Sequence, residues 1–154
     1  YYVTINKAEN PSTSEDGDGN IDIGSSENGI LSVNFTKPMS AQNILPGWTG
    51  SHEFTLTNNS DRTVVYNINL INVKNTFTSN NFVYSLVKDG RTLISKTPAL
   101  KSSGTVASNL IIAPGQTVSF SMNYELINLK NEAQDYDQGK NYSGTLEIEI
   151  VSAN

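Results

Sequence analysis

The residues best suited to chemistry are oxygen-bearing side chains near the start of the chain. Calcium takes about six to eight hard oxygen ligands, which alternate residues of a tightly curled loop can supply. Position 6 of such a loop holds Ile21 where an EF-hand has glycine, and no helical pattern flanks the segment. The sequence therefore leaves two interpretations open, a weak calcium site and a solvated acidic linker, of which the linker is preferred. The calcium ligands would be the residues at loop positions 1, 3, 5, 7 and 12, namely Asp16, Asp18, Asn20, Asp22 and Glu27.

Catalytic constellations are incomplete. His52-Glu53 begins like the zinc protease motif H-E-x-x-H, but Leu56 stands where the second histidine is required. His52 is the only histidine, so it is also the only candidate base for a serine hydrolase, and no G-x-S-x-G turn accompanies it. The chain has no cysteine, which excludes disulfides, iron–sulfur clusters, thiolate zinc sites and cysteine nucleophiles. We therefore expect no enzymatic activity and no catalytic residues.

A ligand-binding surface would need exposed aromatic side chains on one face. Trp48 is the only tryptophan, and the tyrosines of the predicted loops nearest the end of the chain are Tyr136 and Tyr142. Together they could stack against a carbohydrate. The simpler interpretation of Trp48, which follows a Pro-Gly turn, is that it covers one end of the core.

Composition limits the class of partner. Of the 154 residues, 36% are apolar and only 16% are charged, and the formal net charge of −5 disfavours nucleic acid, which selects clustered Lys and Arg. No apolar run approaches the ~18 residues that span a bilayer, so no transmembrane segment is expected. The chain starts at Tyr1 without a Met, which fits either a trimmed sequence or a secreted protein whose signal peptide has been removed.

The elements that hold these residues are predicted to be strands. Pro46-Gly47 and Pro114-Gly115 each precede a segment in which apolar and polar residues alternate, and Asp89-Gly90 is the dipeptide of a two-residue hairpin. The segments 97–109 and 128–139 read as loops, the second with at most one helical turn. We count about eight strands, which predicts an all-β fold, an antiparallel β-sandwich or jelly roll. The predicted strands lie near residues 1–6, 31–36, 54–57, 62–73, 81–88, 91–96, 118–126 and 146–150.

The first strand is separated from the others by a polar, acidic segment. We therefore divide the chain into residues 1–28, an N-terminal extension strand with its tether, and residues 29–154, the β-sandwich domain. A short apolar strand on a long tether is well placed to complete the sheet of another molecule, although an ordinary first strand explains the pattern equally well. The candidate assembly strand consists of Tyr1, Tyr2, Val3, Thr4, Ile5 and Asn6.

Several of these segments resemble the TasA/camelysin-type family of secreted fibre proteins. The resemblance lies in the aromatic start, the segment 29–35 before Leu45-Pro46-Gly47, the strand 54–59 that ends in Asn, and Asn141-Tyr-Ser-Gly144 before the last strand. It covers roughly half of the chain. The resemblance implies a jelly-roll subunit of a biofilm matrix fibre that polymerises by donor-strand exchange. Some members are described as metalloproteases, an activity that the missing second histidine does not support here.

The function expected from the sequence is therefore structural. The chain would be a homopolymeric subunit of an extracellular fibre or pilus-like filament, secreted or held at the cell surface, with a surface or matrix as its further contact. The alternatives are a virion or cell-surface decoration domain whose N-terminal arm docks onto a lattice, and a carbohydrate-binding module.

Overall fold

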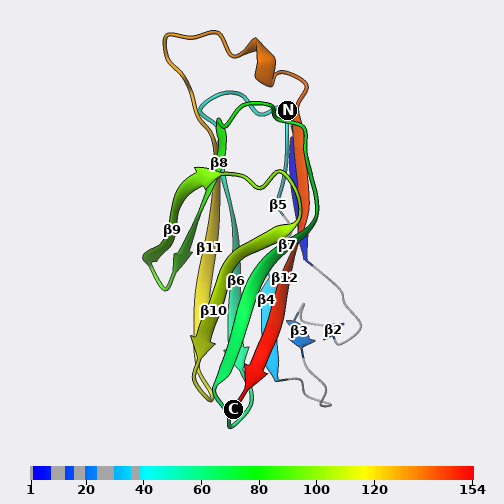
Figure 1. Cartoon of the computed structure of the whole chain (residues 1–154), viewed down its shortest axis with the longest axis vertical. Helices are drawn as coiled ribbons and strands as arrows, with labels where there is room; N and C mark the ends of the chain where they lie inside the picture. Colours follow the sequence, from blue (N-terminus) through cyan, green and yellow to red (C-terminus); the bar gives the residue numbers. More distant parts are fainter. Residues whose placement is uncertain (1, 8–12, 16–19, 24–29, 36–38) are drawn as a thin grey trace.

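Two β-sheets packed face to face make up the fold, as the sequence predicts (Figure 1). The computed structural model describes residues 2–7, 13–15, 20–23, 30–35 and 39–154. One sheet has five strands in the order β10-β7-β12-β1-β5, and the other has seven in the order β2-β3-β4-β6-β11-β8-β9. The strands are β1 (Tyr2–Lys7), β2 (Thr13–Glu15), β3 (Asn20–Ile23), β4 (Leu31–Phe35), β5 (Met39–Gln42), β6 (Thr49–Asn58), β7 (Val64–Asn75), β8 (Phe82–Lys88), β9 (Arg91–Pro98), β10 (Gly104–Ile112), β11 (Thr117–Leu126) and β12 (Asn141–Ala153).

The core lies between the sheets and is filled by every second residue of the central strands. In β11 the buried positions are Val118, Phe120, Met122, Tyr124 and Leu126, and their neighbours face solvent. The same alternation runs through β6, β7 and β12, because side chains of successive strand residues point to opposite faces. The apolar period of two is thus the sequence signal that fixes which face of each strand is buried.

The two Pro-Gly segments form tight turns with the glycine at positive φ, +94° at Gly47 and +73° at Gly115. In the first, the N–H of Trp48 donates to the carbonyl of Leu45 over 2.9 Å, and in the second the N–H of Gln116 donates to the carbonyl of Ala113 over 3.1 Å. A left-handed conformation at the third turn position is where glycine is favoured. Each turn leads directly into one of the paired strands β6 and β11.

The Asp89-Gly90 hairpin is confirmed. Asp89 and Gly90 have φ of +49° and +80°, the two left-handed residues of a type I′ turn, and they join β8 to β9. The N–H of Ser119 donates to the Asp89 carboxylate over 2.8 Å, which ties the hairpin to β11. The only helical turn in the described part of the chain is η1 (Asp135–Asp137), inside the segment predicted to contain at most one.

The prediction of a loop over residues 97–109 is wrong. β9 continues to Pro98, and Gly104–Ile112 forms β10, an edge strand paired with β7. Two register shifts interrupt this pairing, and Val106 and Ala107 are buried side by side. A bulged strand loses its period of two, so its sequence carries no alternation to detect. The short strands β2, β3 and β5 were likewise not predicted.

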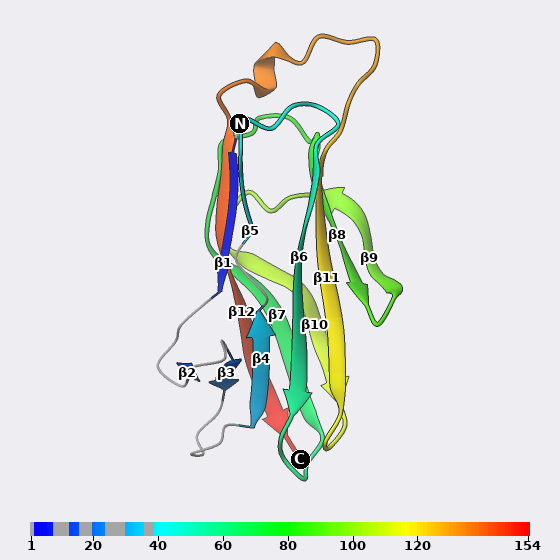
Figure 2. The ribbon, with the colours of Figure 1, turned by 180° about the vertical axis from the view of Figure 1, so that it is seen from behind.

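The long connection between β11 and β12, seen in Figure 2, is anchored by the buried carboxylate of Asp137. Asp137 is fully buried, and it accepts hydrogen bonds from the hydroxyl of Ser79 at 2.6 Å and the amide of Asn81 at 3.1 Å. The side chain of Gln134 donates to the same carboxylate over 3.3 Å. This connection and the β5–β6 turn form the end of the molecule where β1 begins. No helix in the described part of the protein has the length and apolar character needed to cross a membrane.

Candidate assembly site

The N-terminal strand occupies a slot between two other strands of its own chain. β1 runs parallel to β12, in a register from Tyr2 opposite Asn141 to Lys7 opposite Leu146. On its other edge it pairs antiparallel with β5, from Tyr2 opposite Gln42 to Ile5 opposite Met39. Its backbone is therefore bonded on both sides, and the first strand of the chain lies against the last one (Figure 2).

β5 depends on β1 for its place in the sheet. Among the described strands, β1 is the only sheet neighbour of β5. β5 is four residues long, and a strand of this length has few hydrogen bonds of its own to hold it. Removal of β1 would therefore separate β5 from the sheet and leave residues 141–146 of β12 without a hydrogen-bonded neighbour on that side. The slot thus has one firm side, β12, and one weak side, β5.

The firm side is fixed at its end by hydrogen bonds to Thr76. The N–H of Thr76 donates to the carbonyl of Asn141 over 2.9 Å, and the N–H of Asn141 donates to the Thr76 hydroxyl oxygen over 2.7 Å. From Tyr142 onward β12 also pairs with β7 to its far end. The edge that β12 presents to β1 is therefore held in position by bonds that do not involve β1.

An aromatic cluster packs against the inner face of β12 beside the slot. Tyr142 is fully buried, with its ring centroid 5.1 Å from that of Phe82 and 6.1 Å from that of Tyr124. Burial raises the pKa of the Tyr142 and Tyr124 phenols above their ordinary value, so both remain neutral. Such packing makes β12 a rigid edge against which a strand can add.

His52 lies in the core on β6 and has no hydrogen-bond partner within the described structure at either ring nitrogen. Its ring stacks on Phe35, with centroids 5.4 Å apart. Burial lowers its pKa from the ordinary value, because the charged form cannot be solvated there. Glu53 follows it on the exposed face of the strand, so the two side chains of the zinc-like dipeptide point in opposite directions. Within the described residues, no three His, Asp or Glu side chains gather as a metal site.

The candidate calcium residues are only partly placed. Asn20 and Asp22 lie in β3, where they pair with Asn34 and Ser32 of β4. Asp16, Asp18 and Glu27 lie outside the described residues, as does Tyr1 of the assembly strand. Calcium binding by this segment stays a prediction.

The three aromatic residues considered for carbohydrate stacking do not share one exposed face. Tyr142 is in the core, Trp48 is half-buried against it, and only Tyr136 is exposed, at 45%. Trp48 therefore covers one end of the core, as the simpler of the two interpretations of the sequence predicts. The proposed platform of Trp48, Tyr136 and Tyr142 is wrong, because the period that buries Leu146 and Ile148 in β12 also buries Tyr142.

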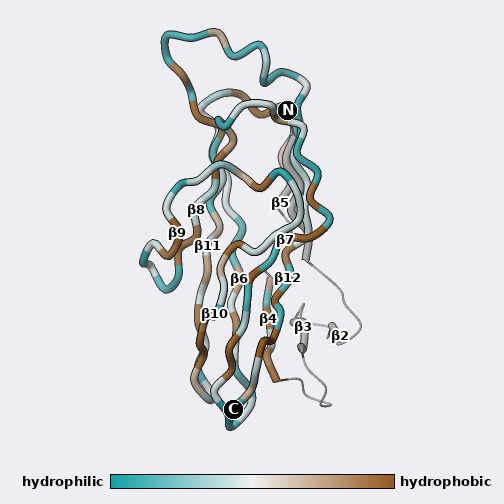
Figure 3. The backbone as a smooth tube through the Cα atoms, in the orientation of Figure 1, coloured by the Kyte–Doolittle hydropathy of each residue, from teal (hydrophilic) through white to brown (hydrophobic). Residues whose placement is uncertain are grey.

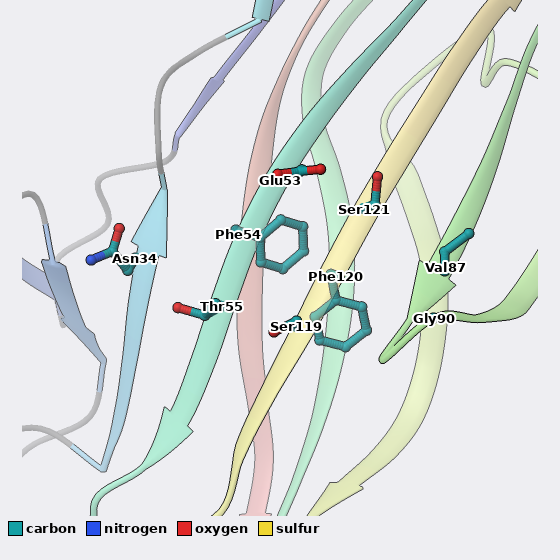
Figure 4. Close-up of a pocket in the computed structure, with 9 residues that line it drawn as sticks. All are labelled: Asn34, Glu53, Phe54, Thr55, Val87, Gly90, Ser119, Phe120 and Ser121. Atoms are coloured by element: carbon teal, nitrogen blue, oxygen red, sulfur yellow. The ribbon is translucent and has the colours of Figure 1, made fainter.

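A shallow hollow of about 510 Å³ opens on the outer face of the seven-stranded sheet (Figure 4). Short polar side chains on neighbouring strands line it, including Thr55 on β6 and Ser119 and Ser121 on β11. The rings of Phe54 and Phe120 stack on each other at 5.0 Å and belong to the buried face. No aromatic platform is therefore available in this hollow.

The part of the slot that the sequence did not reveal is β5. Met39–Gln42 alternates apolar and polar residues over only four positions, too short a run to identify a strand, and it pairs with a strand far away in the chain. A further local signal is Pro38 immediately before it, since proline is tolerated at the start of an edge strand. No family model matches the chain, and no curated protein matches it.

Proposed function

We propose that this protein is a structural subunit of an extracellular fibre, in which copies are linked when β1 of one copy fills the slot of the next. The observation that carries the proposal is the pairing of β1 on both edges by strands distant from it in sequence. An identical strand from a second copy would make the same two sets of hydrogen bonds. Exchange of an identical element is a low-cost route to assembly, because it gains an intermolecular link without requiring a new interface.

The length of the connection after β1 supports exchange between neighbours. Residues 8–12 separate β1 from β2, and residues 8–19 separate it from β3, which pairs with β4 in the other sheet. When extended, these connections span up to about 17 Å and about 40 Å. A strand on such a connection can reach the slot of an adjacent copy. The connection is also where the sequence concentrates acidic and small polar residues, which favour solvated chain.

Of the three other sheet edges, β10 and β9 carry features that discourage strand addition, and the third is the three-residue strand β2. β10 is bulged twice, and Asn109 within it has a φ of +55°. β9 carries Arg91, Lys96 and Pro98. Bulges, charges and proline on an edge are devices by which proteins avoid unwanted pairing. Assembly by strand addition is therefore directed toward the slot between β12 and β5.

The direct test removes the strand. We expect the chain without residues 1–6 to stay folded or nearly folded and to form no fibres by electron microscopy, whereas the full chain forms them. A synthetic peptide with the sequence of residues 1–7 should bind the truncated chain, raise its melting temperature and shorten fibres of the full chain. A scrambled peptide of the same composition is the control.

Two results would contradict the proposal. Fibres formed by the truncated chain would mean that another surface drives assembly. A full chain that never assembles, combined with a truncated chain that unfolds, would make β1 an ordinary internal strand.

A further inference from the structure

Two pairs of like charges lie on opposite sides of the protein. The basic pair, Lys88 and Arg91, flanks the turn of the β8–β9 hairpin, and the acidic pair, Glu147 and Glu149, lies near the middle of β12. In Figures 1 and 2 the hairpin projects from one side of the molecule, and β12 runs along the other. Within the described residues, none of these four side chains forms an ion pair. Each pair therefore keeps its charge available for a partner outside its own chain.

The basic pair is held close together by the hairpin. Lys88 and Arg91 occupy directly opposite positions of β8 and β9, where side chains share one face and like charges destabilise the pairing. Asp89 lies between them in sequence, but its carboxylate accepts the N–H of Ser119 over 2.8 Å and forms no ion pair with either cation. All three charged side chains border a shallow hollow of about 400 Å³, and Figure 3 shows that the turn is hydrophilic. Two cations against one anion leave the tip of the hairpin positive, in a chain whose formal net charge is −5.

The acidic pair is held in place by hydrogen bonds across the five-stranded sheet. The amide of Asn69 donates to the Oε1 atoms of both Glu147 and Glu149, over 3.0 and 3.3 Å, and the amide of Asn67 donates to Glu149 over 2.9 Å. The bonds from Asn67 and Asn69 lower the pKa of Glu149, so this carboxyl stays ionised. Asn69 in turn accepts from the hydroxyl of Thr105 on β10 over 2.9 Å. The two carboxylates are thus oriented on the outer face of β12, which reduces the entropy lost when a partner binds them.

The nearest other charges do not offset either pair. Lys74 is the only basic residue of β7, it lies opposite a residue four positions before the acidic pair, and β10 has no basic residue. Lys7, the last residue of β1, is opposite Leu146, which is buried on the other face of β12. On the hairpin, Lys96 is bound to Glu125 at 2.6 Å. The two pairs are therefore opposite in sign, and each lacks a counter-charge among the described residues of its own chain.

We propose that the β8–β9 hairpin of one copy contacts the outer face of β12 in a second copy, so that the basic pair meets the acidic pair. The spacings agree, because directly opposite residues of a hairpin have Cα atoms about 5.5 Å apart and alternate residues of one strand about 6.6 Å apart. The partner is a second copy because this chain itself carries both members of the complementary set, and complementary charge selects partner and orientation.

This contact rests on the proposed fibre for its role. The two surfaces lie on opposite sides of the molecule, so the contact is heterologous and joins neighbouring filaments side by side instead of closing a dimer. Exposed ion pairs contribute little individually, so the contact between single copies is weak. Along two filaments it repeats, and each contact raises the effective concentration for the next. Bundling should be reversed by about 0.5 M sodium chloride, which shortens the Debye length to about 4 Å.

The test compares full-length variants at low ionic strength, by electron microscopy and by low-speed sedimentation of bundles. Lys88→Glu combined with Arg91→Glu reverses the basic pair, and we expect single filaments with about tenfold less protein in the pellet. Glu147→Gln combined with Glu149→Gln removes the acidic charges but keeps side-chain oxygens that can accept the cross-strand hydrogen bonds. It should reduce bundling in the same way.

Lys130→Glu combined with Lys140→Glu is the matched control, because it makes the same change of net charge on the connection between β11 and β12. Filaments of this control should stay bundled. Carbodiimide cross-linking of mixed isotope-labelled and unlabelled full chain locates the contact directly. It should join Lys88 to Glu147 or Glu149 in linked peptides of which one is labelled and the other is not.

The outcomes separate this contact from the proposed fibre. Equal bundling in the hairpin variant and the control, or the absence of mixed-isotope links from Lys88, would overturn the contact while leaving strand exchange intact. Such links in a full chain that forms no fibres would instead reject the proposed fibre and keep the contact between copies.

Discussion

β6 and β11 are two strands with the same backbone arrangement, and at two buried positions a polar side chain in β6 stands where β11 has an apolar one. Each begins two residues after the glycine of a Pro-Gly turn and ends eleven residues after it. They pair antiparallel along their whole length, and the turn before each strand is bonded to the end of the other. At one end Gly47 donates to the carbonyl of Leu126, and at the other Gly115 donates to the carbonyl of Asn58 over 2.9 Å.

At these two positions the buried side chain is polar in β6 and apolar in β11. Five residues after the glycine, β6 has His52 and β11 has Phe120, and at the last position β6 has Asn58 and β11 has Leu126. All four are buried. Asn58 has its hydrogen bonds satisfied, whereas His52 has none that the described residues provide. The comparison shows that the turns and the strand pairing determine the backbone, whichever side chains the strands carry. The two buried polar side chains of β6 differ in their contribution to stability, because Asn58 is hydrogen-bonded and His52 is not.

The largest effect should come from replacing Asn58 with the residue of its counterpart. The Asn58 amide donates to the carbonyls of Arg62 at 2.7 Å and Ile112 at 3.1 Å, and its oxygen accepts from the N–H of Ser60 at 3.0 Å. Asn58→Leu leaves these groups unpaired, and we expect a loss of about 3 kcal/mol in the free energy of unfolding. Urea unfolding followed by the fluorescence of Trp48, the only tryptophan, measures it.

Asn59→Leu is the matched control for this change. Asn59 is exposed and donates to the Ser32 hydroxyl at 2.5 Å, so its replacement should cost less than about 1 kcal/mol. Equal losses in the two variants would mean that burial of the Asn58 bonds is not what distinguishes the end of β6.

The second largest effect is a loss of folding stability at low pH, which we expect from His52. Its pKa is lowered in the folded protein, so the unfolded chain binds the proton more readily and stability falls as the pH drops below about 6.5. The loss reaches at most about 1.4 kcal/mol per pH unit and stops below the folded pKa. His52→Phe, which copies Phe120, should remove this dependence between pH 7 and pH 5. Melting temperatures of both proteins across that range check it, and parallel curves would assign the acid sensitivity elsewhere.

The smallest effect tests whether the two turns are equivalent. A Cβ added at Gly47 would lie 4.0 Å from the side chain of Asn128, and a Cβ added at Gly115 would have no neighbour within 4 Å. The loss of stability on substitution by alanine therefore comes from the positive φ alone. Gly47→Ala and Gly115→Ala should each lose about 1 to 2 kcal/mol. Gly104→Ala is the control, because Gly104 has no positive φ and its Cβ would lie 3.5 Å from Leu100. A large difference between the two turn variants would break the comparison.

The sequence predicts the parts of this fold whose side chains alternate. The long strands and the Asp89-Gly90 hairpin follow from apolar period and turn residues, because each is a local property. β10 could not be predicted, since its bulges remove the period, and β5 could not, since Met39–Gln42 is a strand only while β1 lies beside it. The candidate site divides in the same way. The sequence predicts a strand over residues 1–6, and the structure has one at Tyr2–Lys7, but both of its neighbours are set by pairings across the chain that no local pattern contains.

The pairing of the first strand with the last has a consequence for the order of events during synthesis. β1 is synthesised before its partner Asn141–Leu146, which follows about 140 residues and roughly 10 to 30 s later. Throughout that interval the slot does not exist, and pairings between distant segments are also the slowest to form afterwards. A newly made chain therefore passes through a period in which its first strand is free. The time at which two copies meet, as much as their affinity, would then decide which strand fills the slot.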